Sequence, residues 1–278
     1  MEFAVTGATG FLGTRLRAFL ETQGHTIRAL PRDGGSVDGA DAVIHLAGEP
    51  VAQRWTAAAK RRIRDSRVLG TERLLARIAE ASRRPGVLVC ASAIGYYGDR
   101  GEVELTECSP PGSGFLPETC VEWEQAASKA SDLGLRVVSA RIGLVLAANG
   151  GALQKMLPPF RLGLGGPIGD GRQWMSWIHA TDLVRLLVFC ATHDSVSGPV
   201  NAVAPQSQRN AAFTRMLAGA LHRPAVIPVP KFALHVLYGE MAQIVYGSSR
   251  VLPKAAEAAG FSFEYPSLGP ALEALQLR

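Results

Sequence analysis

The fold of this chain is decided by one stretch near its start, Val5-Thr6-Gly7-Ala8-Thr9-Gly10-Phe11-Leu12-Gly13. Its three glycines follow a GxxGxxG spacing between an apolar run at residues 3–6 and a helical pattern at residues 10–22. In such a turn one glycine permits the bend, another lets backbone N–H groups approach a pyrophosphate, and the last allows close helix packing. A plain glycine-rich turn is the alternative, but the flanking strand and helix favour a dinucleotide site. No Lys-Ser or Lys-Thr pair completes a P-loop, which disfavours ATP.

Alternating strand and helix patterns extend from this stretch over the first half of the chain. Short apolar runs predict strands at residues 3–6, 26–30, 42–46, 87–91 and 136–142. Helical spacings predict helices at residues 10–22 and 56–81, followed later by a helix at 182–192 and a short strand near 199–203. This rhythm is typical of an α/β fold with a doubly wound parallel Rossmann sheet.

A second, smaller lobe is predicted beyond the sheet-forming half. Residues 158–169 are rich in Gly and Pro, but apolar side chains are interleaved with them, which indicates an ordered loop. From residue 206 onward, helical patterns alternate with Pro-punctuated loops. We therefore assign residues 1–150 to a dinucleotide-binding Rossmann domain, to which residues 175–204 return. Residues 151–174 and 205–278 are assigned to a mixed α/β substrate lobe.

The composition fits a compact globule without a nucleic-acid partner. Among 278 residues, 47% are hydrophobic and 19% are charged, which supplies a sizeable core and argues against a disordered or fibrous chain. The count of 29 Lys and Arg against 24 Asp and Glu gives a net charge of +5. The one dense basic run, at residues 60–67, predicts a solvated helix face because no nucleic-acid-binding module accompanies it.

Neither export, nor a membrane span, nor a bound metal is predicted. Residues 1–5 enter a strand pattern directly, without the basic region and apolar core of a signal peptide. The most apolar later stretch, residues 183–191, is about half as long as a bilayer span needs. The four cysteines form no CxxC pair and the six histidines lack zinc-ligand spacing. We expect reduced thiols and a cytoplasmic protein.

The residues that follow the second predicted strand favour NADP over NAD. The position at which an acidic residue would accept the ribose hydroxyls of NAD is Pro31, and Arg32 follows it. A guanidinium can form charge-assisted hydrogen bonds with the 2′-phosphate of NADP, whereas a carboxylate would repel it. Asp33 lies near the expected offset and is the competing interpretation, and Arg32 as an ordinary surface residue is the other alternative.

Several motifs together resemble the extended short-chain dehydrogenase/reductase superfamily: TGATGFLG at 6–13, HLAG at 45–48 and WIHATD at 177–182. Further motifs are similar to its atypical NAD-dependent epimerase/dehydratase branch, whose members are labelled "epimerase family protein" and sometimes "cell division inhibitor". These motifs are GEP at 48–50, SAIGYYG at 92–98, KMLPPF at 155–160, QWMSWIH at 173–179 and GEMA at 239–242. The resemblance runs across nearly the whole chain.

The resemblance implies a nucleotide-binding lobe, a smaller substrate lobe and a cleft between them. It implies that the pyrophosphate is held by Gly7, Gly10, Phe11, Leu12 and Gly13. It also implies that Arg32 meets the adenosine phosphate, and that the cofactor passes over Leu46, Ala47 and Gly48. Residues 33–41 are short for a third strand with its connections, so the usual adenine-contacting acidic residue has no clear place.

The catalytic residues of typical members are only partly present. Those members use a serine after the fifth strand and a Tyr-x-x-x-Lys pair, in which the lysine and the positive nicotinamide lower the pKa of the tyrosine. Ser92 fits the serine. The best alignment of residues 115–124 places Leu116 and Cys120 where the tyrosine and the lysine belong, so the usual pair is absent.

Three interpretations of this gap stay open. In the first interpretation, Tyr96 or Tyr97 supplies the proton from beside Ser92. The alternative is that both rings only pack the cleft wall. In the second interpretation, the Cys120 thiol takes part in the reaction. Nothing local marks this thiol as a thiolate, and the alternative is that Cys120 is a buried apolar residue. In the third interpretation the cofactor is bound without efficient hydride transfer, which would make the protein a redox-linked sensor or scaffold.

Other candidate residues lie in the segment 155–182. We expect His179 to be a hydrogen-bonded structural residue rather than a base, and Asp182 to cap the helix at 182–192. Two roles are equally open for Trp174, Met175 and Trp177: they line an apolar wall of the cleft, or they pack in the core. An anion-binding role and a solvated surface are both open for Lys155, Arg161 and Arg172.

The leading prediction is an NADP(H)-dependent oxidoreductase or epimerase-like enzyme acting on a small polar carbonyl or alcohol, including a nucleotide-linked sugar. The alternative is a non-catalytic NADP(H)-binding regulator whose affinity for a partner depends on the cofactor, and its motivation is the absent Tyr-Lys pair. The expected partner is a small-molecule substrate, and the sequence predicts no oligomeric state.

Overall fold

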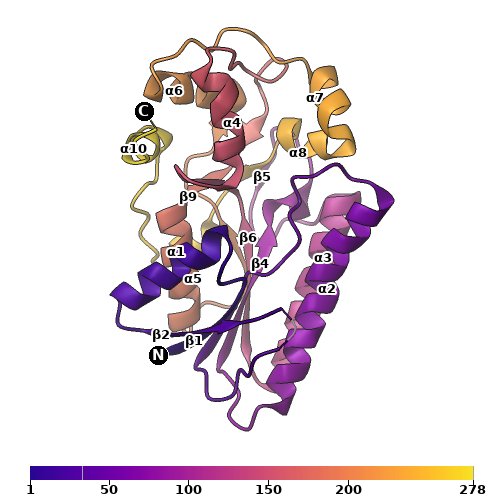
Figure 1. Cartoon of the computed structure of the whole chain (residues 1–278), viewed down its shortest axis with the longest axis vertical. Helices are drawn as coiled ribbons and strands as arrows, with labels where there is room; N and C mark the ends of the chain where they lie inside the picture. Colours follow the sequence, from indigo (N-terminus) through magenta and orange to yellow (C-terminus); the bar gives the residue numbers. More distant parts are fainter. Residues whose placement is uncertain (33, 278) are drawn as a thin grey trace.

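The centre of the molecule is a six-stranded parallel sheet, described in a computed structural model that covers residues 1–32 and 34–277 (Figure 1). The strand order is β10-β6-β4-β3-β1-β2, and every neighbouring pair is parallel. This confirms the predicted doubly wound α/β fold, with strand bounds within two residues of those expected. The strands are β1 (Glu2–Thr6), β2 (Thr26–Leu30), β3 (Ala42–His45), β4 (Val87–Ala93), β6 (Arg136–Ile142) and β10 (Gly198–Ala202).

Helices cover both faces of this sheet (Figure 1). One face is covered by α1 (Phe11–Thr22) and α5 (Ala180–Thr192), the other by α2 (Ala57–Glu80) and α3 (Phe115–Ser128). The central strands are therefore apolar on both sides, and Ala42, Val43 and Ile44 of β3 are all fully buried. Strands enclosed in this way are continuous apolar runs, which is why they stand out in the sequence.

The strand order reverses beside β1. The chain adds β2 on one side of β1 and then returns to add β3 on the other side. Residues 34–41 contain no helix or strand, so the shortness noted in the sequence reflects a direct crossing to β3. In open α/β sheets, ligands bind at the carboxyl ends of the strands beside such a reversal. The ends of β1 and β3 are thus the place to look for a site.

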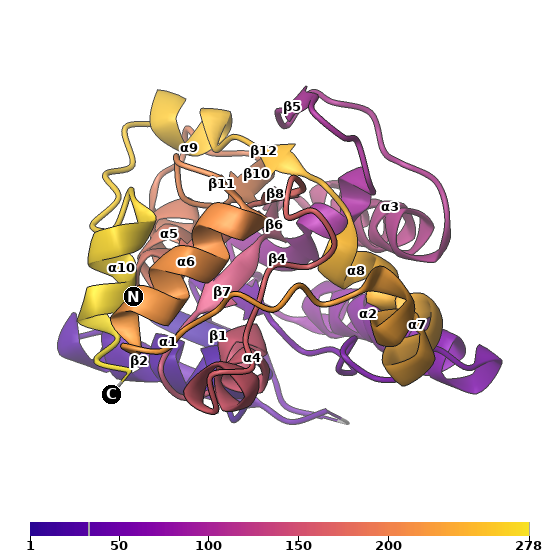
Figure 2. The ribbon, with the colours of Figure 1, turned by 90° about the horizontal axis from the view of Figure 1, so that it is seen from above.

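A second group of helices lies beyond the carboxyl ends of the strands (Figures 1 and 2). Both views place α6 and α10 side by side on one flank and α7 with α8 on the other. The helices of this part are α4 (Gly151–Arg161), α6 (Asn210–Ala220), α7 (Lys231–Tyr238), α8 (Ala242–Tyr246) and α10 (Leu268–Ala274). The short helix α9 (Lys254–Ala258) packs instead against β10 of the sheet. Its small strand pairs are β5 (Glu104–Leu105) with β12 (Arg250–Val251), β7 (Leu144–Leu146) with β9 (Trp177–His179), and β8 (Trp174–Met175) with β11 (Gln208–Arg209). Single 3-10 turns are η1 (Ile94–Tyr97), η2 (Lys129–Leu133) and η3 (Gly239–Met241).

The apolar cores only partly follow the predicted division into lobes. A cluster centred on Leu157, Phe213 and Leu272 serves α4, α6 and α10, which belong to the predicted substrate lobe. Ala256 and Phe261 were assigned to that lobe as well, but they are buried against α1, α5 and the sheet. The boundaries at residues 150 and 174 stay predictions.

The start of α5 differs from the expectation. Asp182 is not its N-cap, because the helix begins at Ala180 and the capping group is His179, whose Nδ1 accepts from the Thr181 N–H at 3.2 Å. The buried Asp182 carboxylate instead accepts from the backbone N–H groups of Glu264 and Tyr265, at 2.9 and 2.8 Å. These donors lie more than eighty residues away in the chain. His179 thus has the structural role predicted for it.

Among residues 1–32 and 34–277, no helix is both long enough and apolar enough to cross a membrane. The same residues contain no group of three His, Cys, Asp or Glu side chains that could hold a metal ion. Cys90, Cys108, Cys120 and Cys190 are free thiols in the structure.

Candidate functional site

The glycine turn between β1 and α1 is closely packed backbone. Gly7 has a φ of +70°, and a Cβ there would lie 3.0 Å from the Ala47 backbone nitrogen. A Cβ on Gly13 would lie 2.1 Å from the Gly7 carbonyl oxygen and 2.6 Å from Ala8 Cα. Only residues without a side chain allow the helix to approach the strand this closely.

The first turn of α1 presents backbone donors without a competing anion of its own. Its N-cap is Gly10, which makes no side-chain capping bond, and the turn contains no acidic residue. Phe11, Leu12 and Gly13 are the first residues of the helix. Unpaired N–H groups and the helix dipole together favour a bound anion at such a terminus.

The side chain of Phe11 connects this turn to the start of α4. A Cβ on Gly150 would lie 2.4 Å from the Phe11 ring, and one on Gly151 would lie 3.0 Å from it. The Arg15 guanidinium lies 4.4 Å from the centre of the same ring, and Arg15 donates to the carbonyls of Phe11 and Asn149. The ring is therefore held between α1 and the segment that enters the second group of helices.

The segment 46–48 leaves β3 next to the end of β1. The Leu46 N–H donates to the Thr6 carbonyl at 3.2 Å, and the Ala47 N–H donates to Thr6 Oγ1 at 3.2 Å. Thr6 Oγ1 also bonds His45 Nδ1 at 2.6 Å. Burial, with a smaller contribution from Arg77, lowers the pKa of His45 to about 4, so the imidazole is neutral near pH 7.

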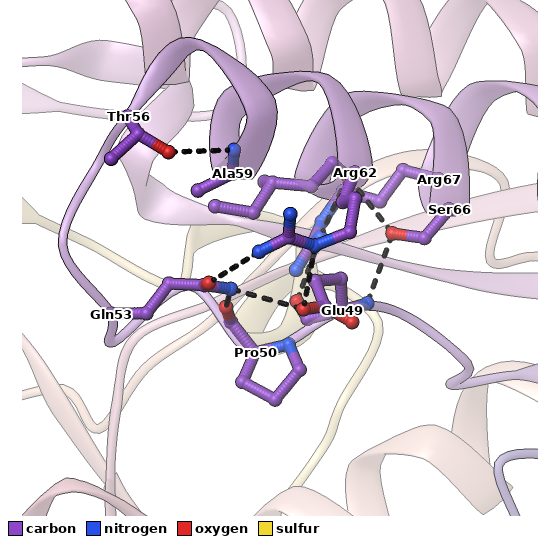
Figure 3. Close-up of polar contacts among 9 residues, drawn as sticks. Glu49, Pro50, Gln53, Thr56, Ala59, Arg62, Ser66 and Arg67 are labelled. Carbon is purple, nitrogen blue, oxygen red and sulfur yellow. Dashed lines mark hydrogen bonds and ion pairs between the residues drawn. The ribbon is translucent and has the colours of Figure 1, made fainter.

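Polar contacts with α2 order the loop that follows Gly48 (Figure 3). The Glu49 N–H donates to Ser66 Oγ at 2.9 Å, and Gln53 Nε2 donates to the Glu49 carboxylate at 3.2 Å. Arg67 Nη1 donates to the Glu49 carbonyl at 3.1 Å, and Thr56 caps α2 through the Ala59 N–H. Glu49 of the Gly-Glu-Pro motif is thus tied to α2 through Ser66 and Arg67.

Arg32 lies exposed in the turn after β2, whose end pairs with the end of β1. Arg77 of α2 donates to the Arg32 carbonyl at 3.2 Å and to the Gly34 carbonyl at 2.7 Å. These bonds hold the turn beside the glycine segment. Asp33, the competing acidic residue, lies outside the described residues.

Ser92 lies within β4 rather than after it, and it belongs to a buried charged network. Its Oγ donates to Glu124 Oε1 of α3 at 2.6 Å. Arg141 of β6 binds the same carboxylate through Nε at 2.9 Å and Nη2 at 2.8 Å. Ser92 and Arg141 are each 3% exposed, and an ion pair this well buried depends on its full set of hydrogen bonds.

Tyr97 joins this network, whereas Tyr96 borders it. The Tyr97 hydroxyl accepts from Arg141 Nη1 at 2.9 Å and lies 2.7 Å from Asn201 Oδ1, to which it can donate. Tyr97 is fully buried, and this burial raises its pKa to about 12. The ring of Tyr96 is only half-buried and lies 3.5 Å beneath the Arg141 guanidinium. Of the two tyrosines, Tyr96 is the one that reaches the surface.

Glu124, Arg141 and Asn201 were missed in the sequence, although two of them leave a signal. Arg141 is a charge inside an otherwise apolar strand, and Glu124 follows Cys120 by one helical turn. A buried charge implies a buried partner. The identity of that partner depends on the pairing of β4 with β6 and on the packing of α3.

The positions of the absent Tyr-Lys pair hold apolar and uncharged groups. Leu116 packs against Gly95, with its Cδ1 3.4 Å from the place of a Gly95 Cβ. Cys120 is buried against the Ala93 backbone, and burial raises the pKa of its thiol to about 12. A thiol in this state is protonated at neutral pH, which removes it as a nucleophile.

The structure does not bring together the three basic residues that were considered for anion binding, Lys155, Arg161 and Arg172. Lys155 reaches the loop after Gly48 and donates to the Ala52 carbonyl at 3.1 Å, whereas Arg161 faces the carboxy-terminal segment at Leu277. Arg172 is exposed. Trp177 is fully buried in the core of the second helix group.

The other two residues of the apolar trio, Trp174 and Met175, lie nearer the surface. Trp174 lines a surface cavity of about 280 Å³, between the guanidinium groups of Arg209 and Arg250. Met175 Sδ accepts from Asn210 Nδ2 at 3.2 Å. The described contacts thus place Trp177 in the core and Trp174 on an outer wall.

The open parallel sheet, the glycine turn and the reversal beside β1 define a dinucleotide-binding protein of the Rossmann class. Residues 33–203 match the family described as NAD dependent epimerase/dehydratase, and residues 229–275 match a domain of unknown function, DUF1731. Since the first match covers more than half of the chain, the chain belongs to the NAD dependent epimerase/dehydratase family. The resemblance stated from the motifs is confirmed.

Relatives from distant organisms share this sequence over nearly its whole length. The chloroplastic homolog of epimerase family protein SDR39U1 from Arabidopsis thaliana is 40% identical over 301 residues, which cover 99% of this chain and 86% of the plant protein. The epimerase family protein SDR39U1 of Bos taurus is 38% identical over 291 residues, covering 98% and 99% of the two chains.

Two crystal structures extend the comparison to three dimensions. Human epimerase family protein SDR39U1 (isoform 2) with NADPH matches with a TM-score of 0.94 and 34% identity, over 99% of both chains. The nucleoside-diphosphate sugar epimerase from Corynebacterium glutamicum matches with a TM-score of 0.81 and 35% identity, over 100% of this chain and 58% of the other.

Proposed function

We propose that this protein is an NADP(H)-binding oxidoreductase or epimerase-like enzyme. The observation that carries the proposal is the uncapped first turn of α1, set in a glycine cradle at the reversal of the sheet. Gly7, Gly10, Phe11, Leu12 and Gly13 would hold the pyrophosphate there. The human relative crystallised with NADPH supports this choice of cofactor.

The phosphate of the adenosine ribose would be recognised by Arg32. Its turn is held by Arg77 at the end of β2, one strand away from the glycine cradle. A guanidinium binds phosphate oxygens through directed, charge-assisted hydrogen bonds, which makes Arg32 the basis for preferring NADP to NAD. From the pyrophosphate the cofactor would pass over Leu46, Ala47 and Gly48.

Bound NADP(H) would supply or accept the hydride at the substrate carbon. The chain must then move one proton at the substrate oxygen, and Tyr96 is the phenol that its exposure makes available. The Arg141 guanidinium lies over the Tyr96 ring, with its Cζ 3.5 Å from the ring centre, and so helps to fix the orientation of the ring. Ser92 and Tyr97 would orient Tyr96 and Arg141 from the buried side of the network.

The substrate class proposed is a small polar carbonyl or alcohol, including a nucleotide-linked sugar. The bacterial relative described as a nucleoside-diphosphate sugar epimerase supports the second possibility. Lys155, held at the loop after Gly48, would lie on the substrate side. Four free thiols are consistent with a reducing, cytosol-like compartment.

A non-catalytic NADP(H)-dependent regulator is the second candidate, and Cys120 and Leu116 favour it. Cys120 places a protonated thiol where the lysine would be, and Leu116 places an apolar side chain where the tyrosine would be. Such a protein would bind the cofactor and signal its presence to a partner without turning it over.

Three measurements test the proposals. Titration of NADPH and NADH, followed by cofactor fluorescence, should give tighter binding of NADPH, and absent or equal binding would refute the NADP assignment. Oxidation of NADPH is then followed over a panel of carbonyl substrates for the parent, Ser92→Ala, Tyr96→Phe and Tyr97→Phe. Turnover that is the same in all four proteins would show that the chemistry lies elsewhere. A partner captured only in the presence of NADPH, with no turnover, would favour the regulator.

A further inference from the structure

Exposed apolar side chains gather on α7, on α8 and on the loop before them, at one margin of the molecule (Figures 1 and 2). Within the described residues, more than half of the exposed large apolar side chains fall in the segment 226–244. We call this set the α7 face, and its members are Val226, Ile227, Phe232, Val236, Leu237, Tyr238 and Ile244. Scattered apolar side chains are normal on a protein surface, whereas a concentrated patch marks an interaction surface.

Helix α7 is anchored to the rest of the molecule, so this face is presented from a fixed base. Leu234 is buried, and the helix packs against α8 and η3. Just past its carboxyl end, the Glu240 carboxylate binds Lys60 of α2 at 2.7 and 2.6 Å. Phe232 and Val236 are one helical turn apart and lie on one side of α7, with 72% and 70% of their surface exposed. The most exposed part of the helix is therefore an ordered apolar ridge.

The α7 face has about the area that one side of a stable dimer needs. Its seven side chains have exposed fractions between 43% and 77%. At roughly 100 Å² each they present about 700 Å² of apolar surface, close to the roughly 800 Å² per partner of a standard interface. The largest apolar patch of a typical monomer is only about 300 to 600 Å². The size of the face thus favours a protein partner that covers it.

The charges at the two ends of α7 favour a second copy of the chain as that partner. Lys231, the first residue of the helix, is exposed, and its ammonium lies 5.6 Å from the Tyr246 ring centre; among the described residues it forms no ion pair. At the other end, the Glu240 side chain stays 42% exposed although Lys60 binds it. If two α7 helices cross antiparallel about a two-fold axis, Lys231 of each copy approaches Glu240 of the other. An anionic lipid surface would attract Lys231 but repel Glu240, whereas a second copy complements both charges.

We propose that the α7 face is a homodimer interface, in which the α7 helices of two copies pack antiparallel across a two-fold axis. Phe232 and Val236 of one copy pack against the same two residues of the other, and Lys231 and Glu240 pair at both ends of the contact. The outer side of α2 and α3 does not compete for this role, because it carries ion pairs such as Arg64 with Glu122. The pairing is independent of the proposed function, since no cofactor or substrate takes part in it.

The test is sedimentation velocity of the full chain over a range of protein concentrations, without cofactor. We expect the parent to sediment with twice the mass of one chain and to dissociate on dilution. Phe232→Ser combined with Val236→Ser should weaken the dimer about 100-fold or more, because two central apolar contacts are lost in both copies. Lys231→Glu should weaken it about 10-fold, because two attractive pairs become repulsive. Leu69→Ser is the matched control, since Leu69 is an exposed apolar residue of α2 outside the α7 face.

A dimer that is weakened by the double substitution and by Lys231→Glu, but not by Leu69→Ser, supports the proposal. A parent that stays a single chain at every concentration overturns it, and so does a dimer that the double substitution leaves intact. Flotation with vesicles of phosphatidylcholine and phosphatidylserine in equal parts tests the lipid alternative. A single chain that floats only while Phe232 and Val236 are present would assign the α7 face to a membrane surface and overturn the dimer. If the double variant does not fold, Lys231→Glu decides, and NADPH titration of the parent tests the proposed function separately.

Discussion

Adding one methyl group to Gly13 should destabilise the protein and abolish cofactor binding together. The Cβ of Gly13→Ala would lie 2.1 Å from the Gly7 carbonyl oxygen and 2.6 Å from Ala8 Cα. Both are backbone atoms of the turn, so no side-chain rotation relieves the contact. Overpacking of this severity costs about 3 kcal/mol. For a chain of this size, that cost corresponds to a fall of about 6 to 12 °C in Tm.

Gly70→Ala provides a matched control of opposite sign. Gly70 lies inside α2, and no heavy atom lies within 4 Å of the place of its Cβ. Replacing an interior helical glycine by alanine stabilises a helix by about 1 kcal/mol. The same methyl group should therefore raise Tm by about 2 to 4 °C at this position.

Both variants are assayed by thermal unfolding and by NADPH titration. Gly70→Ala should bind NADPH as the parent does, and Gly13→Ala should show no saturable binding, because the displaced turn no longer aims its N–H groups at the phosphates. If Gly13→Ala melted with the parent and bound NADPH equally well, the packing argument for the cradle would be refuted.

Three further predictions concern the network, the neutral histidine and the cofactor phosphate. Glu124→Gln leaves the buried Arg141 without its carboxylate, and urea unfolding should show a loss of about 3 kcal/mol; a loss below about 1 kcal/mol would contradict the buried ion pair. The unfolded chain protonates His45 below about pH 6.5, whereas the folded chain does so only near pH 4, so stability should fall as the pH decreases through this window by about 3 kcal/mol. His45→Asn should lose that part of the pH dependence, and an unaltered slope would assign it to other groups. Arg32→Gln should weaken NADPH binding about 10- to 100-fold and leave NADH binding unchanged; equal effects on both would remove Arg32 from the phosphate site.

The sheet and its glycine turn could be predicted because their causes are local. β3 and β4 are apolar on both faces, so each appears as a continuous run in the sequence. The turn depends on glycine spacing, which is equally visible in one short stretch. The strand bounds were accordingly correct to within two residues.

The polar network could not be predicted because its members meet only in the folded chain. Tyr97 and Asn201 are 104 residues apart, and Arg141 meets Glu124 only because β6 and α3 lie side by side. The prediction that Asp182 caps α5 was wrong for the same reason, because Asp182 binds the backbone N–H groups of Glu264 and Tyr265, which are distant in sequence. In both cases a local preference was outweighed by a partner distant in sequence.

The Phe11 ring restricts how this protein can be re-engineered. It occupies the room that side chains at Gly150 and Gly151 would require, so the nucleotide cradle and the entrance to α4 have interlocking surfaces. A foreign substrate lobe grafted at this junction would need the two glycines and the asparagine carbonyl that receives Arg15. Chimeras that keep Phe11 but replace Gly150 and Gly151 should therefore assemble poorly, however suitable the transplanted lobe is for its own substrate.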